Sequence, residues 1–412
     1  MKIGYAQCLI TPSLDKPVYL AGFGNNRCAK TIHDDLFVRS LSIQDDQRTL
    51  VLAALDLIGL FSHDVGDVIQ ALKASDTFTA FNPEIIIAST HTHHGPDTLG
   101  LWGPDDKTCG VDSGYMTATK EIIAGTILAS LSALQPASVK WAYVRVPGVA
   151  KNARNPGIVD DELTLAQFSS EGEVLVTLFN FPCHPEVLWE HNPDITSDYP
   201  GYLRKEVEKQ TGSPCIFFAG ALGGMMTPDV REHSFEEAES MGRRLAEEGL
   251  KALARVESQT SNVGIQKKEV RVKLTNILYK LAFRRNLLPD RRDKYGYIYT
   301  EANLIKIGGL WFATVPGEML PKLGLQLKAW MIEAGAQTAG VIGLANDELG
   351  YILPAEDFKY PWNPLRPGKH YEETNSIGKE IGPRLMEALR LMIVSEAKES
   401  PNSRATSRAR IE

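Results

Sequence analysis

Short apolar runs rich in β-branched residues alternate along the chain with stretches of helical period, and this alternation constrains the fold more than any other feature. The predicted strands cover residues 49–55, 84–88, 139–146, 174–179, 214–218, 304–307, 310–314 and 340–344. The predicted helices cover residues 63–74, 115–134, 199–210, 235–256, 319–334 and 377–393. Because such alternation is typical of strand–helix–strand units, the sequence predicts an α/β fold with a mixed β-sheet core and flanking helices.

The chain is expected to form one domain over residues 1–396, since neither a fixed repeat nor a Pro/Ser-rich linker divides its 412 residues. Residues 277–301 mix Leu, Tyr and Arg without a clean period, which predicts an insertion or lid. Residues 354–370 are rich in Pro, Trp and Tyr and are expected to form an ordered loop near a functional site. The polar residues 397–412 are predicted to be a disordered tail.

Charge and targeting features exclude several classes of protein. Lys and Arg total 44 against 51 Asp and Glu, a net charge of −7, which argues against a nucleic-acid binder because such a protein needs a basic face. No signal peptide is recognised at the N-terminus, and the uncharged run 122–139 contains Gln135 and Pro136, as a buried helix does but a membrane span rarely does. The five scattered cysteines form no C-x-x-C motif. We therefore expect a cytoplasmic protein without an integral membrane span.

Three of the nine histidines fall within four residues, directly after the predicted strand 84–88. Residues two apart in an extended segment face the same side, so His91 and His93 are expected to converge. Ligands bind at the carboxyl ends of strands in α/β folds, and neutral imidazole is the commonest zinc ligand. The pattern with His94 therefore favours a metal site; a histidine turn that only caps the strand is the alternative.

Polar side chains also follow other predicted strands. His184, Glu318 and the segment N-D-E-L-G-Y at 346–351 each come after one, although a strand-end histidine often packs and a glutamate at a helix start is favoured by the helix dipole. Asp198 is expected either to cap the helix that begins near residue 199 or to orient a ligand histidine. A glycine-rich loop without a Walker lysine or a G-x-S-x-G motif is predicted to present the Thr227 hydroxyl.

Together these motifs resemble the neutral/alkaline (non-lysosomal) ceramidase family of metal-dependent hydrolases, which cleave N-acyl amide bonds. The similar segments are A-G-F-G at 21–24, I-H-D-D-L-F-V-R at 32–39, T-H-T-H-H-G-P at 90–96, H-P at 184–185, S-D-Y-P-G at 197–201, P-G-E at 316–318 and G-Y at 350–351. They follow the family's order from about residue 4 to about residue 386, and the ordered set is more specific than any single motif. The resemblance implies a ceramidase-catalytic-domain-like fold.

The resemblance also implies a cofactor and a set of site residues. Zinc would be held by His91, His184, Glu318 and Tyr351. The implied catalytic residues are His93, Arg154 and Thr227. His93 would transfer protons, while Arg154 and Thr227 would steady the developing oxyanion, with a surface arginine as the alternative for Arg154. Asp97 and Asp198 are expected to support the ligand side chains.

The loop at 224–228 departs from the family pattern. It reads G-M-M-T-P where the family has G-D-V-S-P, so Thr227 stands in place of the serine credited with catalysis and Met225 in place of the aspartate. A threonine hydroxyl still donates and accepts hydrogen bonds, but its side chain is stiffer. His94 also replaces a serine of the family motif.

The sequence thus predicts a zinc-dependent hydrolase that cleaves an N-acyl, ceramide-like amide bond with a metal-activated water. The expected substrate is a small N-acyl amide or lipid-like molecule with one apolar arm, more soluble than long-chain ceramide. Two alternatives stay open. One is an amidohydrolase-type barrel enzyme acting on another amide or ester, because H-x-H after a strand also opens that site. The other is a non-catalytic relative that binds a metal or ligand.

Overall fold

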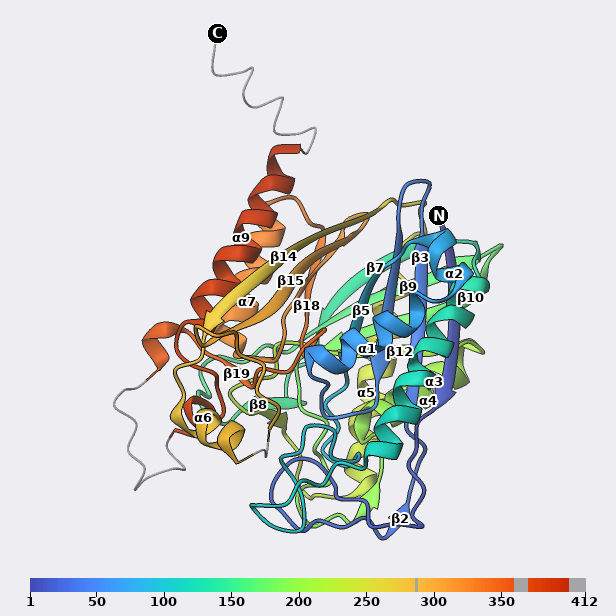
Figure 1. The fold of residues 1–412 in the computed structure, drawn as a ribbon. Helices are drawn as coiled ribbons and strands as arrows, with labels where there is room; N and C mark the ends of the chain where they lie inside the picture. The colour runs from blue at the N-terminus through green and yellow to red at the C-terminus, as the bar shows by residue number, and fades with distance from the viewer. Residues whose placement is uncertain (286–287, 359–369, 400–412) are drawn as a thin grey trace.

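Three larger β-sheets build the fold in the computed structural model, which describes residues 1–285, 288–358 and 370–399 (Figure 1). The first sheet contains, in spatial order, β5 (Glu84–Ser89), β4 (Thr49–Leu55), β3 (Phe37–Gln44), β1 (Lys2–Leu9) and β6 (Gln135–Pro136). The second contains β12 (Cys215–Ala219), β10 (Glu173–Phe181), β9 (Glu162–Ser170) and β7 (Ser138–Arg145). The third contains β14 (Val263–Lys273), β15 (Tyr297–Ile307), β16 (Leu310–Thr314) and β18 (Thr338–Ile342).

Three two-stranded ladders complete the strand pairing among the described residues. They are β11 (Asp194–Ile195) with β2 (Thr31–Ile32), β13 (Met226–Pro228) with β8 (Ala150–Asn152), and β17 (Glu318–Met319) with β19 (Tyr351–Ile352). The helices are α1 (Ser62–Leu72), α2 (Asp76–Phe81), α3 (Ser113–Ser132), α4 (Tyr199–Thr211), α5 (Phe235–Leu253), α6 (Ile277–Arg284), α7 (Pro321–Glu333), α8 (Tyr371–Thr374) and α9 (Ile381–Glu399), with a short 3₁₀ helix η1 (Ala355–Asp357).

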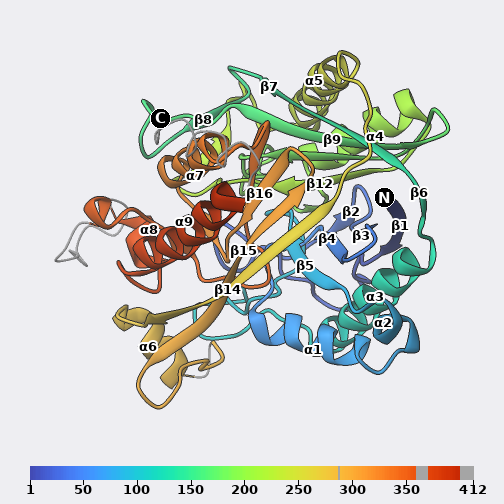
Figure 2. The ribbon, with the colours of Figure 1, turned by 90° about the horizontal axis from the view of Figure 1, so that it is seen from above.

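The three sheets enclose a common core and carry their helices on the outside. Ile43, Phe168 and Phe312, one from each sheet, are fully buried in this central core. On the outer faces, α1 and α3 pack on the first sheet, α4 and α5 on the second, and α7 and α9 on the third (Figure 2). Because β4 is buried on both faces, its sequence is a continuous apolar run rather than an alternating one. The predicted α/β fold with mixed sheets is confirmed, and the described strands form open sheets instead of the eight-stranded barrel that the amidohydrolase alternative requires.

Each sheet contains one parallel pair of strands joined through a helix. The pairs are β4 with β5, β10 with β12, and β16 with β18. All other strand pairs in the three sheets are antiparallel. In such units the carboxyl ends of the parallel strands form the ligand-binding edge, so each sheet contributes one edge of this kind.

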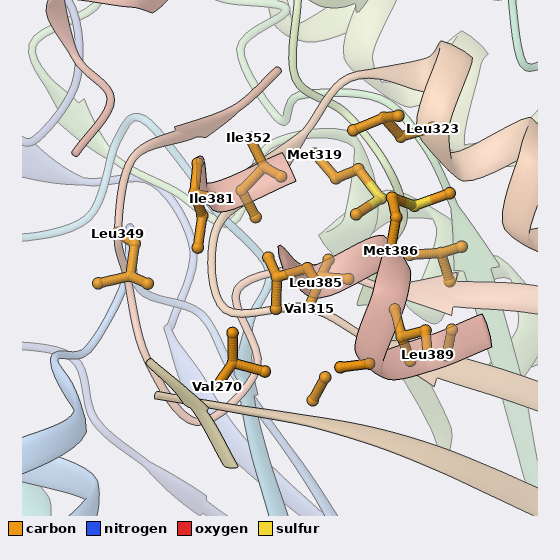
Figure 3. Close-up of a cluster of buried hydrophobic side chains, with 14 of the residues drawn as sticks. Val270, Val315, Met319, Leu323, Leu349, Ile352, Ile381, Leu385, Met386 and Leu389 are labelled. Carbon is orange, nitrogen blue, oxygen red and sulfur yellow. The ribbon is translucent and has the colours of Figure 1, made fainter. Parts of the chain in front are cut away.

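A buried hydrophobic cluster fixes the ladder of β17 and β19 against α7 and α9 (Figure 3). Met319 and Ile352 are fully buried within it, in the same cluster as Leu385 and Leu389 of α9. These two residues directly follow Glu318 and Tyr351, so the packing of the cluster holds the two polar side chains in place.

Some predicted segments differ in detail. The expected insertion or lid at 277–301 contains α6 and the first part of β15. The last helix begins at Ile381 rather than near residue 377, because Gly378 has φ +144° and packs against Thr275, a conformation that no helix allows. Of the loop expected at 354–370, residues 359–369, including Trp362, lie outside the described residues, as do residues 400–412 of the expected tail. Within the described chain, we find no helix with the length and apolarity needed to cross a bilayer.

A buried ion pair ties α4 to the end of β4. The Arg204 guanidinium donates two hydrogen bonds, of 2.7 and 2.8 Å, to the two carboxylate oxygens of Asp56. The side chain of Asp56 is fully buried and that of Arg204 is 3% exposed. Asp56 also accepts a hydrogen bond from the backbone N–H of Phe37. The pair therefore joins two strands and a helix at the edge where the histidine segment begins.

Replacing one partner of this pair is expected to destabilise the fold strongly. In Arg204→Ala the buried Asp56 carboxylate loses its counter-charge, which costs about 3–5 kcal/mol of unfolding free energy for buried pairs. Urea denaturation measures the loss. Arg243→Ala removes the exposed Arg243–Glu239 pair as a control and should change stability by less than about 1 kcal/mol. Similar losses in the two variants would contradict the prediction.

Candidate metal centre and active site

The carboxyl ends of the parallel strands deliver the predicted site residues to one place. His91 and His93 follow β5, His184 follows β10, and Glu318 follows β16. One ligand atom from each of the three histidines lies within 4.8 Å of the others, and all three side chains are buried. Their ring centroids are 5.0–5.4 Å apart. The three histidines form a group compatible with binding a metal ion.

His91 and His93 converge as expected, but for a different reason. The prediction assumed an extended segment in which alternate residues share a face. Instead β5 ends at Ser89, and His91 has φ +71°. Such a left-handed conformation is uncommon outside glycine and turns the backbone sharply. The turn, and not strand alternation, brings both rings to the same point.

Backbone carbonyls fix the orientation of two of the rings. The Nδ1 atom of His91 lies 2.6 Å from the carbonyl oxygen of Ile58, and the Nδ1 atom of His184 lies 2.9 Å from that of Met226. A ring nitrogen that faces a carbonyl carries a proton, so Nε2 is the nitrogen that each ring turns toward Glu318. These Nε2 atoms lie 3.6 Å (His91) and 3.0 Å (His184) from Oε2 of Glu318.

The ladder of β17 and β19 sets Glu318 opposite Tyr351. The two residues are direct partners in the parallel register, and the hydroxyl of Tyr351 lies 3.7 Å from the sulfur of Met225. Burial and the nearby Glu318 carboxylate raise the pKa of Tyr351 well above its ordinary value. The structure therefore brings together all four residues that the resemblance implies as ligands.

The buried histidines and carboxylates of this site shift one another's pKa values. Burial alone would lower the pKa of His184, but the carboxylates of Glu186 and Glu318 raise it to about 9. Burial works against the charged form of Glu318, yet His91 and His184 hold its pKa well below the usual range. Burial and Glu318 raise the pKa of Glu348 well above its ordinary value. A divalent cation would supply the positive charge that a protonated histidine supplies otherwise, so the nitrogen and oxygen donors fit such an ion.

The N-terminal segment at residues 22–27 packs against His93 and fixes its position. An added Cβ at Gly22 would lie 2.5 Å from Nδ1 of His93, and Gly22 has φ +78°. The ring of Phe23 meets that of His93 edge-on, with centroids 5.0 Å apart. Arg27 donates a hydrogen bond of 3.1 Å to the carbonyl oxygen of His93. Close packing therefore leaves the ring little freedom.

Glu186 is a site residue that the sequence reasoning missed. Its carboxylate is fully buried, and Oε2 lies 3.2 Å from Nδ1 of His93. Burial raises the pKa of Glu186, while His184 and the Thr227 hydroxyl lower it. The available signal was its place two residues after His184 in the segment H-P-E, since an acidic residue so close to a strand-end histidine is unlike ordinary strand-end packing.

A cavity of about 710 Å³ opens beside His93. His93, Arg154, Glu186 and Tyr351 contribute polar atoms to its wall, whereas the loop after β12 contributes Met225 rather than Thr227. Its apolar lining comes from Phe23, Ile158, Trp189, Leu320, Pro321 and Tyr371. The volume lies within the range of small-molecule sites.

Arg154 lies in the cavity wall but is held by acidic side chains. Its guanidinium donates to Glu372 and to both carboxylate oxygens of Glu373, the latter at 3.2 Å, and also to the carbonyl oxygen of Asp357. The side chains of Glu372 and Glu373 are 7% and 1% exposed. Arg154 is therefore not the free surface arginine considered as its alternative, and it ties β8 to the α8 wall of the cavity.

The two predicted supporting carboxylates serve neighbouring backbone. Asp97 accepts hydrogen bonds from the backbone N–H groups of residues 99, 100 and 102. Asp198 caps α4 by accepting from the backbone N–H of Tyr199, and its other oxygen lies 3.7 Å from Nδ1 of His94. Burial raises the pKa of Asp198 to about 7. Burial also lowers the pKa of His94 to about 3, so this fully buried ring stays neutral.

Zinc affinity should depend on His184 and not on an exposed histidine. His184→Ala removes a buried nitrogen donor, so we expect zinc to bind at least about 100-fold more weakly. His191→Ala is the matched control because the His191 side chain is 89% exposed. Calorimetric titration of metal-free protein with zinc measures both. Equal affinity of the two variants would show that His184 does not hold the ion.

Because Gly22 lies against His93 and Gly24 does not, we expect alanine substitution to affect stability very differently at these two positions of one loop. Gly22→Ala combines a positive φ with a clash, and we expect a loss of about 1–3 kcal/mol of unfolding free energy. At Gly24 an added Cβ meets nothing within 4 Å, so Gly24→Ala should be neutral or slightly stabilising. Chemical denaturation of both variants tests this, and a stable Gly22→Ala protein would contradict it.

Comparison with known proteins places this geometry in a known fold. Neither protein-family models nor curated protein sequences give a significant match. The structure is similar to that of neutral ceramidase from Pseudomonas aeruginosa, with a TM-score of 0.79, 18% sequence identity, and coverage of 97% of this chain and 75% of that one. It is also similar to a ceramidase complexed with C2, with a TM-score of 0.78, 16% identity, and coverage of 97% and 76%. The resemblance drawn from the sequence motifs is confirmed at the level of the fold: the chain has the fold of these ceramidase structures.

Proposed function

We propose that the protein is a zinc-dependent hydrolase of N-acyl amides. The observation that carries the proposal is the buried group of His91, His93 and His184 with Glu318. Its member His93 lines a cavity of about 710 Å³. Histidine and carboxylate donors are the ligands that zinc takes in hydrolases. The ceramidases that share the fold support an amide bond as the bond cleaved.

His91, His184, Glu318 and Tyr351 are the proposed zinc ligands. The two Nε2 atoms lie 3.6 and 3.0 Å from the carboxylate of Glu318, and Tyr351 stands across the strand ladder from Glu318. An ion bound between them would take the place of the proton on Nε2. When bound, zinc supplies a Lewis acid that polarises a carbonyl group and lowers the pKa of water. The carbonyl contacts at Nδ1 orient the imidazoles for that role.

His93 and Glu186 would handle the proton. Because Oε2 of Glu186 lies 3.2 Å from Nδ1 of His93, we assign the role of proton acceptor to the opposite nitrogen, Nε2. His93 would take the proton of the attacking water and deliver it to the nitrogen of the leaving amine. Glu186 would hold the ring in one tautomer and stabilise its protonated form.

Arg154 and Thr227 are proposed to steady the negative charge that develops on the substrate oxygen. Glu372 and Glu373 hold the guanidinium of Arg154 at the cavity wall, so its orientation is set before substrate arrives. Thr227 sits beside Glu186 and is 6% exposed. Its stiff side chain would keep the hydroxyl in one direction.

The proposed substrate is a small N-acyl amide with one apolar arm. Phe23, Trp189 and Leu320 give the cavity an apolar side on which an acyl chain can pack. Each buried methylene contributes about 0.8 kcal/mol, so the length of the chain should affect binding strongly.

Hydrolysis of a series of N-acyl amides with a fixed amine tests the function. For zinc-loaded protein we expect kcat/KM to rise several-fold for each two carbons until the apolar side is filled. His184→Ala should abolish turnover, whereas His191→Ala should retain it. Amine release, measured by chromatography, gives the rates.

Three outcomes would count against the proposal. A flat profile, or turnover of long-chain ceramide in detergent alone, would overturn the predicted substrate class. Bound zinc without turnover of any amide or ester in a broad panel would favour a non-catalytic relative. Absence of zinc after reconstitution would overturn the metal dependence.

A further inference from the structure

A surface of basic and apolar side chains lies on α6 and on the adjoining β14–β15 hairpin. This basic–apolar patch comprises Ile277, Leu281, Arg284, Arg285, Tyr295 and Tyr299, all of them exposed. In both ribbon views α6 lies beyond the end of the β14–β15 hairpin, on the outside of the molecule (Figures 1 and 2). Neither the fold nor the proposed chemistry accounts for these exposed side chains.

The helix α6 is amphipathic, but its outward face is apolar as well as basic. Phe283 is 7% exposed and anchors the inner face to the protein. Ile277 and Leu281, one turn apart, point outward with 62% and 41% of their surfaces exposed. Arg284 continues the same face one turn later. A helix of this pattern lies on a lipid–water interface with its apolar residues inserted and its arginines at the headgroups.

The local charge is opposite to that of the whole chain. Residues 271–299 contain eight Lys and Arg against two Asp and Glu, a net of +6, whereas the chain has a net charge of −7. Within the described part of the chain, the ion pairs of these cations are those of Arg291 with Asp347 and of Arg292 with Asp290. The segment is therefore complementary to a negatively charged surface.

Aromatic rings of the hairpin extend the patch. The guanidinium of Arg271 lies 4.1 Å from the centre of the Tyr297 ring, and Arg271 is the cross-strand partner of Tyr299. The ammonium of Lys294 lies 5.0 Å from the ring of Tyr295, which is 66% exposed. Tyrosines with a wet hydroxyl and neighbouring cations are typical of membrane interfaces.

Hydrogen bonds connect the patch to the wall of the cavity. The side chain of Asn276, which caps α6, donates to the carbonyl oxygens of Thr374 and Ser376. The hydroxyl of Tyr279 lies 3.3 Å from the carbonyl oxygen of Asn375. These contacts fix α6 to the last residue of α8 and to the segment that directly follows it, and α8 carries Tyr371 and Glu372 of the cavity lining.

We propose that the basic–apolar patch docks the protein on a lipid surface that carries anionic headgroups. The apolar side chains of α6 enter the interface, while Arg284, Arg285 and the cations of the hairpin contact the headgroups. Docking there places the α8 side of the cavity next to the lipid. The proposal is independent of catalysis, because binding to vesicles requires no turnover.

Vesicle sedimentation with the full chain tests the proposal. We expect most of the protein to sediment with vesicles of phosphatidylcholine containing about 30% phosphatidylserine at low salt, little with pure phosphatidylcholine, and partial release at about 0.5 M salt. Arg284→Glu/Arg285→Glu should lower the partition coefficient at least about fivefold. Arg243→Glu/Arg244→Glu is the matched control, since it makes the same charge change at an adjacent, exposed arginine pair of α5 and should stay within about twofold of the wild type.

A second variant separates docking from folding. Ile277→Asp removes an inserted side chain, but an acidic residue at the first position of a helix is favoured by the dipole, so α6 should persist. The control is Ile332→Asp, which makes the same change at an exposed position of α7. Ile277→Asp should bind anionic vesicles more weakly than this control, while its unfolding midpoint stays equal to that of the control. No sedimentation of the wild type, equal loss in the control variants, or retention on RNA but not on anionic vesicles would overturn the proposal.

Discussion

The buried Asp56 carboxylate is the interaction on which the rest of the site depends. It accepts hydrogen bonds from Arg204 on α4 and from the backbone of Phe37 at the start of β3, and it lies 3.3 Å from the Thr90 hydroxyl. A carboxylate without exposure is tolerated only when its partners are in place. Because Thr90 directly precedes His91, the turn that presents the histidine is held by groups from three distant parts of the chain. The position of the candidate ligand is thus a property of the whole first sheet and of α4.

Much of the fold could be predicted because buried strands carry a strong pattern. The predicted strands at 49–55 and 310–314 coincide with β4 and β16, which are buried along their whole length. By contrast, β14 was missed because its sequence V-G-I-Q-K-K-E-V-R-V-K is rich in charges and has no apolar run. It becomes a strand because eleven of its residues pair with β15. The free energy of this pairing comes from a distant segment, so no local sequence pattern indicates it.

The candidate metal ligands could be predicted from the sequence, but the contacts that hold them in place could not. Strand-end histidines and Glu318 are visible in the sequence, because their chemistry and place relative to apolar runs are local features. The left-handed turn at His91 and the contact of Glu186 with His93 depend on how separate loops meet. Arg154 and its partner Glu372 are 218 residues apart, so no spacing rule could pair them.

The origin of the candidate ligands in three sheets has a consequence for assembly of the chain. His91, His184 and Glu318 each follow a strand of a different sheet, and Tyr351 is joined to Glu318 by a ladder of only two residue pairs. No fragment that lacks one sheet contains the whole set. An ion that binds all of them therefore stabilises only the completely assembled chain and not its partly folded forms. Such an ion would slow the unfolding of the finished protein while leaving its early folding steps unassisted.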